Sequence, residues 1–176
     1  MSRGEIFTRL TIWLALGGYA CGAIASFVGR ESVQWQARAR WAWTIGCIGM
    51  LAHVACAFHV YYDWSQTSAY RETARQTAEV FNFNWGGGLY INYAFIAAWV
   101  LDVIWWWRGF ETYQQRPRYL VWAWQSFFLF MVFNATVVFK TGALRWIGLC
   151  LCVGLVVVWW LRIKPSRYAD SKGMNA

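Results

Sequence analysis

Residues 41–62 read WAWTIGCIGMLAHVACAFHVYY, a stretch that contains no Asp, Glu, Lys or Arg. An α-helix needs about 20 predominantly apolar residues to cross the hydrocarbon core of a membrane, so this stretch is long enough to span one. Residues 10–29 and 119–139 are also free of charge, residues 88–107 contain only Asp102, and residues 142–163 contain only Arg145 and Arg162, one near each end. The sequence therefore predicts an all-α fold, a polytopic bundle of five transmembrane helices.

The composition of the whole chain agrees with this class of protein. Of the 176 residues, 59% are apolar and 14% are charged, whereas soluble domains carry roughly 25% charged residues. The 15 tryptophans fit as well, because Trp concentrates at membrane–water interfaces. We expect residues 1–164 to form a single membrane domain and residues 165–176 to form a disordered cytoplasmic tail.

The basic residues indicate an orientation in the cell membrane. They lie at the ends of the apolar segments and form no dense stripe, which argues against a nucleic-acid partner. Ten of the 16 Lys and Arg residues fall on one side of alternating loops and six on the other. Because cytoplasmic loops carry the excess of Lys and Arg, we predict that the N-terminus lies outside the bilayer and the C-terminus in the cytoplasm.

The first apolar segment has a second interpretation. Arg3 and Arg9, the apolar stretch after them and the small residues at 23–25 resemble the three regions of a cleavable signal peptide. Cleavage would reverse the predicted orientation of every later loop. We favour a retained helix, in which Gly18 and Gly22 are spaced to let a neighbouring helix approach closely.

The longest loop, residues 63–87, contains a candidate surface helix. One helical face carries apolar and small residues, namely Tyr70, Ala74, Thr77, Ala78 and Phe81. The other face places Glu72, Arg75 and Glu79 at ion-pair spacing. The pattern predicts a short amphipathic helix lying on the outer membrane surface.

Motifs of soluble enzymes are missing from the sequence, so no catalytic residue and no metal ligand is assigned. The candidates that remain are polar side chains inside the predicted spans. Such groups are costly in hydrocarbon, and each one is therefore either a structural hydrogen-bonding group or a functional group.

His53 lies near the middle of the second predicted span, and His59 lies six residues further on, towards the outer surface. Six residues turn a helix by about 600°, so the two rings point about 120° apart and cannot share a metal ion. A haem b bound through His53 and Met131, which lies at similar depth in the fourth span, is one hypothesis. The favoured alternative is that His53 donates a hydrogen bond to a facing helix.

Asp102 is the acidic residue inside the third span, about five residues from its inner end. An aspartate there costs about 2.5 to 3.5 kcal/mol on insertion scales, so we expect a partner. Gln125 lies at matching depth in the fourth span, and the two are predicted to form a hydrogen-bonded pair. That pairing predicts that Asp102→Asn folds nearly normally. A proton or cation site at Asp102 is the functional alternative.

Asn92 and Asn134 lie at similar depth in the outer halves of the third and fourth spans. Other polar or aromatic residues are predicted near them, namely His59, Tyr90, Tyr93 and Thr136. Together these residues suggest a cavity open to the outside that would accept a quinone or another small ligand. Ordinary hydrogen bonding between helices is the alternative.

These patterns predict a non-enzymatic membrane subunit or accessory protein that packs with other membrane proteins or with itself. Two other functions stay open. One is a redox-chain subunit that binds haem or quinone, and the other is a small proton-coupled transporter or channel that uses Asp102.

Overall fold

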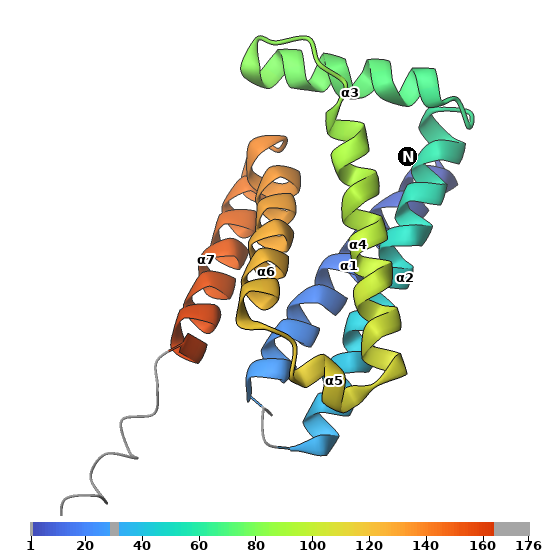
Figure 1. Ribbon diagram of the computed structural model, residues 1–176. Coiled ribbons are helices and arrows are strands. Elements are labelled where there is room, and N and C mark those ends of the chain that lie inside the picture. Colours follow the sequence, from blue (N-terminus) through green and yellow to red (C-terminus); the bar gives the residue numbers. More distant parts are fainter. Residues whose placement is uncertain (1, 29–31, 164–176) are drawn as a thin grey trace, which may run out of the picture.

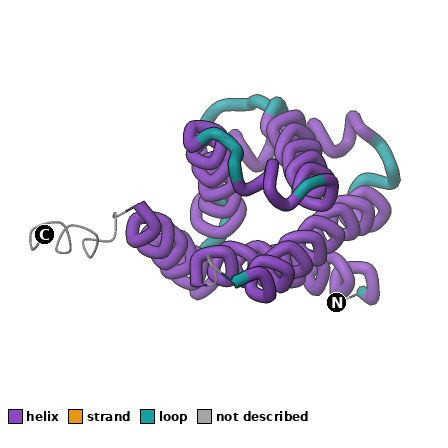
Figure 2. The backbone as a smooth tube through the Cα atoms, turned by 60° about the horizontal axis from the view of Figure 1, so that its bottom comes forward, coloured by secondary structure: helices purple, strands orange, loops and turns teal. Residues whose placement is uncertain are grey.

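The computed structural model describes residues 2–28 and 32–163. Figure 1 shows a bundle of helices, which in chain order are α1 (Arg3–Val28), α2 (Val33–Tyr61), α3 (Gln66–Phe81), α4 (Gly88–Arg108), α5 (Phe110–Gln114), α6 (Arg118–Phe133), the π-helical η1 (Asn134–Val138) and α7 (Ala143–Ile163). The described ranges contain no strand, as Figure 2 shows. The predicted tail, residues 165–176, lies outside the described residues.

Five helical segments are long and apolar enough to cross a membrane: α1, α2, α4, α6 with η1, and α7. They correspond to the five predicted spans, so the all-α architecture is confirmed. Helices α1 and α2 begin several residues before their charge-free stretches. A charge-free stretch indicates only the part of a helix that can lie in hydrocarbon, and the helix itself can extend beyond it. In the first turns of α2, the guanidinium groups of Arg38 and Arg40 stack on Trp35 and Trp107, 4.9 and 4.1 Å from the ring centroids.

Helices α1 and α2 form the most extensive contact in the bundle. Small residues make this approach possible. A Cβ atom added to Gly18 would lie 2.5 Å from the Cα atom of Gly46, and one added to Gly49 would lie 2.9 Å from the backbone nitrogen of Ala15. A Cβ atom added to Gly22 would lie 3.2 Å from Cε3 of Trp43. The close approach predicted from Gly18 and Gly22 is therefore confirmed.

An aromatic cluster joins four helices at the centre of the bundle. Its buried members are Tyr19 of α1, Trp43 of α2, Phe95 and Trp99 of α4, and Phe128 of α6. The Phe128 ring lies 4.8 to 5.4 Å from the rings of the other four residues, measured between centroids. Each such pair contributes about 0.5 to 1.5 kcal/mol beyond the burial of its surface, so these contacts fix the four helices around one point.

Helix α3 lies across one end of the bundle, and α5 lies at the opposite end (Figure 1). Helix α3 begins at Ser65, whose hydroxyl accepts a hydrogen bond from the backbone N–H of Ser68, and ends at Asn82 in the left-handed conformation. It buries Ala74 and Thr77, as the predicted apolar face requires, whereas Tyr70 and Phe81 are exposed. The surface helix is thus present at 66–81, with only part of the predicted face in contact with the bundle.

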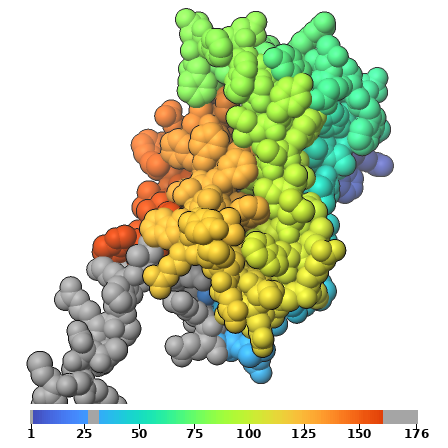
Figure 3. Space-filling model, viewed as in Figure 1, coloured from blue at the N-terminus to red at the C-terminus, as the bar shows by residue number. Residues whose placement is uncertain are grey.

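Few residues of the long helices are fully buried inside the protein. In the most apolar 18-residue window of each long helix, at most 22% of the residues are buried inside the protein, and in α7 the share is 11%. Figure 3 shows α4 and α6 side by side on one face of the bundle, with α3 above them. Five apolar helices with so few buried residues are compatible with a membrane surrounding.

Candidate functional site

Asp102 is the most deeply buried charged residue among the described residues, with 2% of its surface exposed. It lies in α4, less than two turns before the helix ends at Arg108. Its Oδ2 atom accepts a hydrogen bond from the Tyr113 hydroxyl at 2.9 Å. Its Oδ1 atom accepts one from Nη1 of Arg116, also at 2.9 Å. Both carboxylate oxygens therefore have partners.

The segment between α4 and α6 brings these partners back to Asp102. Gly109 is the C-terminal cap of α4, and its backbone N–H donates to the Trp105 carbonyl. The short helix α5 follows, and the Tyr113 N–H donates to the Gly109 carbonyl at 3.0 Å. Pro117 then stands at the N-terminal cap of α6, a position that tolerates its missing N–H. The chain reverses within this segment, so Tyr113 and Arg116 face α4.

Ring and cation contacts hold the cluster in place. The Tyr113 ring stacks on the Trp106 ring with centroids 4.4 Å apart and planes 8° apart. The Arg116 guanidinium lies over the same tyrosine ring, 4.0 Å from its centroid. The Tyr113 phenol lies outside the long helices, and burial, followed by the nearby negative charge of Asp102, raises its pKa. Tyr113 therefore stays protonated near neutral pH and donates its proton to Asp102.

A pocket of about 110 Å³ opens beside this cluster, at the end of the bundle that Figure 2 brings forward. Five parts of the chain line it: Gly22, Ala23 and Ser26 of α1, Gln36 and Trp43 of α2, Trp106 of α4, Tyr113, Gln114 and Arg116 of the α5 segment, and Val121 and Gln125 of α6. Glutamine, arginine, tyrosine and tryptophan side chains dominate the lining. The lining is thus mostly polar or aromatic.

Two tryptophans of the pocket lining have indole N–H groups without an acceptor among the described residues. Trp106 is 3% exposed, and its indole N–H reaches no acceptor in the described part of the chain. The indole N–H of Trp43 lies near the Asp102 carboxylate and interacts with it electrostatically, but it does not reach hydrogen-bond geometry. Trp99 and Trp124, which do not line the pocket, have buried N–H groups without an acceptor in the described ranges as well, so this feature is not specific to the pocket.

The predicted pair of Asp102 and Gln125 is wrong. Within the described ranges no hydrogen bond joins the two residues, and Tyr113 and Arg116 occupy the carboxylate instead. Gln125 does lie close to this cluster, because it lines the same pocket as Tyr113 and Arg116. Sequence reasoning missed the two true partners because both lie in the 108–118 loop, where Arg116 was counted as a determinant of orientation. Gly109 and Pro117 were the signal that this loop turns sharply back.

His53 forms the hydrogen bond to a facing helix that the sequence favoured. Its Nδ1 atom lies 2.9 Å from the carbonyl oxygen of Thr8 in α1, so this nitrogen carries the proton and donates. Met131 packs against the central aromatic cluster. His59 is exposed. The structure does not test whether His53 and Met131 bind haem, and that hypothesis stays a prediction.

The outer polar residues have local partners. The Asn134 side chain donates to the Phe130 carbonyl of its own helix at 2.8 Å. Thr136 donates to the Val132 carbonyl in the same way. Asn92 is exposed, and no hydrogen bond links it to the other members of the predicted set in the described residues. The outer ligand cavity therefore gains no support from these contacts.

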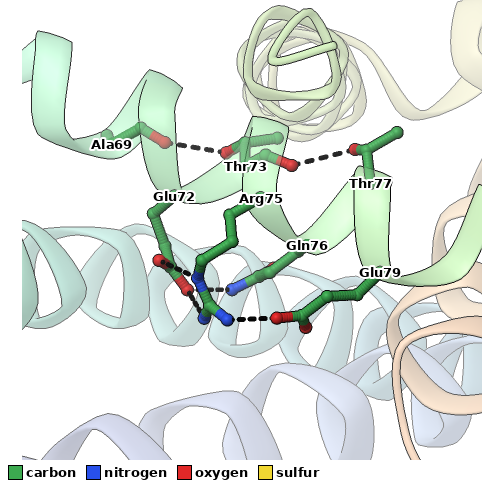
Figure 4. Close-up of polar contacts among 7 residues, drawn as sticks. All are labelled: Ala69, Glu72, Thr73, Arg75, Gln76, Thr77 and Glu79. Carbon is green, nitrogen blue, oxygen red and sulfur yellow. Dashed lines mark hydrogen bonds and ion pairs between the residues drawn. The ribbon is translucent and has the colours of Figure 1, made fainter. Parts of the chain in front are cut away.

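The second polar cluster of the molecule lies on α3 (Figure 4). Arg75 pairs with Glu72 and Glu79, and Gln76 donates to Glu72, all on one side of the helix. The hydrogen bond from Arg75 holds the pKa of Glu72 below its ordinary value. The predicted ion pairs are thus confirmed. These side chains are well exposed, and surface pairs of this kind contribute about 0 to 1 kcal/mol, so the cluster serves the helix rather than a ligand.

Comparison of the chain with protein-family profiles, with curated protein sequences and with solved structures gives no match. The Asp102 cluster and the pocket beside it are therefore the features from which a function can be inferred.

Proposed function

We propose that this chain is a non-enzymatic, multi-pass integral membrane protein that binds a small ligand with hydrogen-bond acceptors in the pocket beside Asp102. The observation that carries the proposal is the lining of the pocket, to which Tyr113 and Arg116 of the α5 segment and Gln125 of α6 contribute polar side chains. A cavity on which a few polar groups converge is the usual form of a small-ligand site.

The other polar groups of the pocket agree with binding rather than catalysis. Asp102 does not line the pocket, and both of its oxygens already accept hydrogen bonds from the lining residues Tyr113 and Arg116. A carboxylate held in this way is not free to act as a general base. The same pairing gives the proton-coupled transporter hypothesis less support than the binding proposal has. Because Asp102 is paired in this way, the proposed role is that of an accessory component that binds a ligand.

Native mass spectrometry of the protein, purified in a mild detergent, tests the binding proposal. We expect a non-covalent small-molecule adduct on the natural chain and its loss in Gln125→Leu, which removes a polar group of the lining and keeps a side chain of similar size. Gln76→Leu is the matched control, because Gln76 lies on α3 and does not line the pocket. An adduct-free natural chain, or equal loss in both variants, would contradict the proposal.

We also propose that the chain assembles with other membrane helices or with a second copy of itself through α7. Gly154 is exposed on α7, and a Cβ atom added there would meet nothing within 4 Å. Cys150 is exposed one turn earlier. Small residues on an outward helix face allow another helix to approach closely.

Oxidative crosslinking in native membranes tests this second proposal. We expect a disulfide-linked species of higher mass that disappears in Cys150→Ser and persists in Cys21→Ser, since Cys21 is exposed on α1. Replacing Gly154 with Leu should weaken the crosslink by blocking close approach. Crosslinking that is unaffected by Cys150→Ser would remove α7 as the interface.

A further inference from the structure

Three contacts between aromatic rings set the level of α3 on the bundle. Each contact joins a ring on or just before α3 to a ring at the end of a long helical segment. The pairs, with the distance between ring centroids, are Phe58 of α2 with Trp64 (6.2 Å), Tyr90 of α4 with Tyr70 (6.2 Å), and Phe139 at the end of η1 with Phe81 (6.4 Å). These segments are three of the five candidate membrane spans, so α3 lies at the level where the spans end, and it runs across the bundle (Figure 1).

Four aromatic side chains at this level, which we call the end aromatics, are largely exposed. They are Trp64 (63%), Phe81 (58%), Phe83 (61%) and Trp85 (43%). Trp64 comes three residues after α2 ends, and Trp85 comes three residues before α4 begins. A residue advances the chain by at most about 3.6 Å, so both tryptophans lie within about 11 Å of a span end. Tryptophan is enriched at this depth in membrane proteins, where its ring is half in lipid.

The charged side of α3 points another way around the helix. Glu72, Arg75 and Glu79 form ion pairs along that side (Figure 4). Phe81 follows Glu79 by two residues, and two residues turn a helix by about 200°, so the Phe81 ring points away from the ion pairs. Charged groups are costly in hydrocarbon, whereas exposed aromatic rings are costly in water. The two sides of α3 therefore require different surroundings.

We infer that α3 is an interfacial helix, with the end aromatics in the boundary between lipid head groups and acyl chains and the ion-paired side in water. The level of α3 identifies lipid as the occupant, because a bundle that spans a membrane is surrounded by lipid where its spans end. Aromatic contacts to three spans hold the helix at this level. The inference rests on the proposed membrane location and does not involve the pocket beside Asp102.

The test uses the full chain in phosphatidylcholine nanodiscs, one chain per disc, and measures how fast a membrane-impermeant maleimide labels an introduced cysteine. Trp64→Cys and Phe83→Cys report on the end aromatics. Ser68→Cys and Gln76→Cys are the matched controls, because both residues are exposed on α3 and each stands four residues from Glu72, on the charged side. We expect the first two variants to be labelled at least about tenfold more slowly than the controls. The natural chain supplies the background, since its five cysteines lie within the long helices.

Three outcomes would overturn the inference. Equal labelling rates at all four positions in nanodiscs would show that the end aromatics face water. Slow labelling of Trp64→Cys and Phe83→Cys in native membranes, but fast labelling in nanodiscs, would show that another protein covers them instead of lipid. A chain that does not float with lipid in a density gradient would remove the membrane location itself, and this result is separate from the labelling rates. Two reporting variants are used so that the failure of one to fold does not decide the result.

Discussion

Arg116 and Asp102 form a buried ion pair, with Nη1 of the arginine 2.9 Å from Oδ1 of the aspartate. Only 12% of the arginine side chain and 2% of the aspartate side chain are exposed. The pair connects the α5 segment to α4, and its arginine also lines the pocket. The fold tolerates these two buried charges only as a pair, because a buried charge without its partner is strongly destabilising.

Removing one partner of this pair should therefore cost more than removing both. We expect Arg116→Met to lower the free energy of unfolding by about 3 to 5 kcal/mol, because it leaves the Asp102 carboxylate buried without a cation. The double variant Asp102→Leu with Arg116→Met should be more stable than Arg116→Met alone. Denaturant unfolding in detergent micelles measures both changes, and a strictly additive result would rule out a coupled pair.

The structure also changes the expectation for Asp102→Asn. The sequence predicted near-normal folding, because asparagine would keep a hydrogen bond to Gln125. With Arg116 as the actual partner, asparagine leaves the guanidinium without a counter-charge in a largely buried place. Asp102→Asn should therefore be clearly destabilised in the same unfolding measurement.

Tyr113 should make stability depend on pH above about 10. The folded pKa of its phenol is raised from the ordinary value of about 10 by burial and by Asp102. As the pH rises past 10, the unfolded chain releases this proton first, so the stabilisation that is present below pH 10 is progressively lost. Unfolding measured from pH 8 to 11 should show a steeper loss for the natural chain than for Tyr113→Phe.

At pH 7 the same substitution measures the hydrogen bond itself. Tyr113→Phe keeps the ring that stacks on Trp106 and removes the donor to Oδ2 of Asp102. Hydrogen bonds to charged groups contribute about 1.5 to 3 kcal/mol, and a loss of that size is expected. A variant as stable as the natural chain would show that the hydroxyl is not a significant partner.

The difference between what the sequence predicted and what it missed has a physical cause. The spans, the α3 ion pairs and the hydrogen bond of His53 follow from local rules: apolar length, helical spacing and the cost of an imidazole in hydrocarbon. The partners of Asp102 depend on how a loop of 11 residues, 108–118, folds back on its own helix. Depth along the span restricts which helices can face each other, but it carries no information about a loop that re-enters the bundle.

Gly18 should tolerate no side chain, because α1 and α2 touch through their backbones there. A Cβ atom on Gly18 would lie 2.5 Å from Gly46 Cα and 2.8 Å from the Ala42 carbonyl oxygen. Overpacking of this kind costs about 1 to 3 kcal/mol, so Gly18→Ala should unfold at a lower denaturant concentration. Gly17→Ala is the matched control, since its Cβ would meet nothing within 4 Å, and it should be neutral or slightly stabilising.

The haem hypothesis makes a spectroscopic prediction that separates it from a structural role of His53. If His53 and Met131 ligate haem, the protein purified from haem-replete cells should show a Soret band that disappears in His53→Ala and survives in His59→Ala. If His53 acts only through its hydrogen bond to Thr8, the natural chain is colourless and His53→Ala loses about 0.6 to 2 kcal/mol of stability. The absorption spectrum of the folded natural chain decides between the two.

The orientation in the membrane yields the last prediction. Figure 1 places α3 and the start of α1 at one end of the bundle, and α5 and the end of α7 at the other. The sequence assigns ten of its 16 Lys and Arg residues to loops on the same side as the loop between α4 and α6, which predicts that this side faces the cytoplasm.

Reporter fusions test this orientation at two points. A green fluorescent protein fused to the C-terminus should fluoresce, and alkaline phosphatase fused there should be inactive. Alkaline phosphatase inserted after Asn82, just beyond α3, should be active. The opposite pattern at both points would reverse the orientation. An N-terminus at Ser26 in the purified protein would instead establish cleavage of α1. Because α1 supplies Gly22 and Ala23 to the pocket lining, that result would also remove one wall of the binding site.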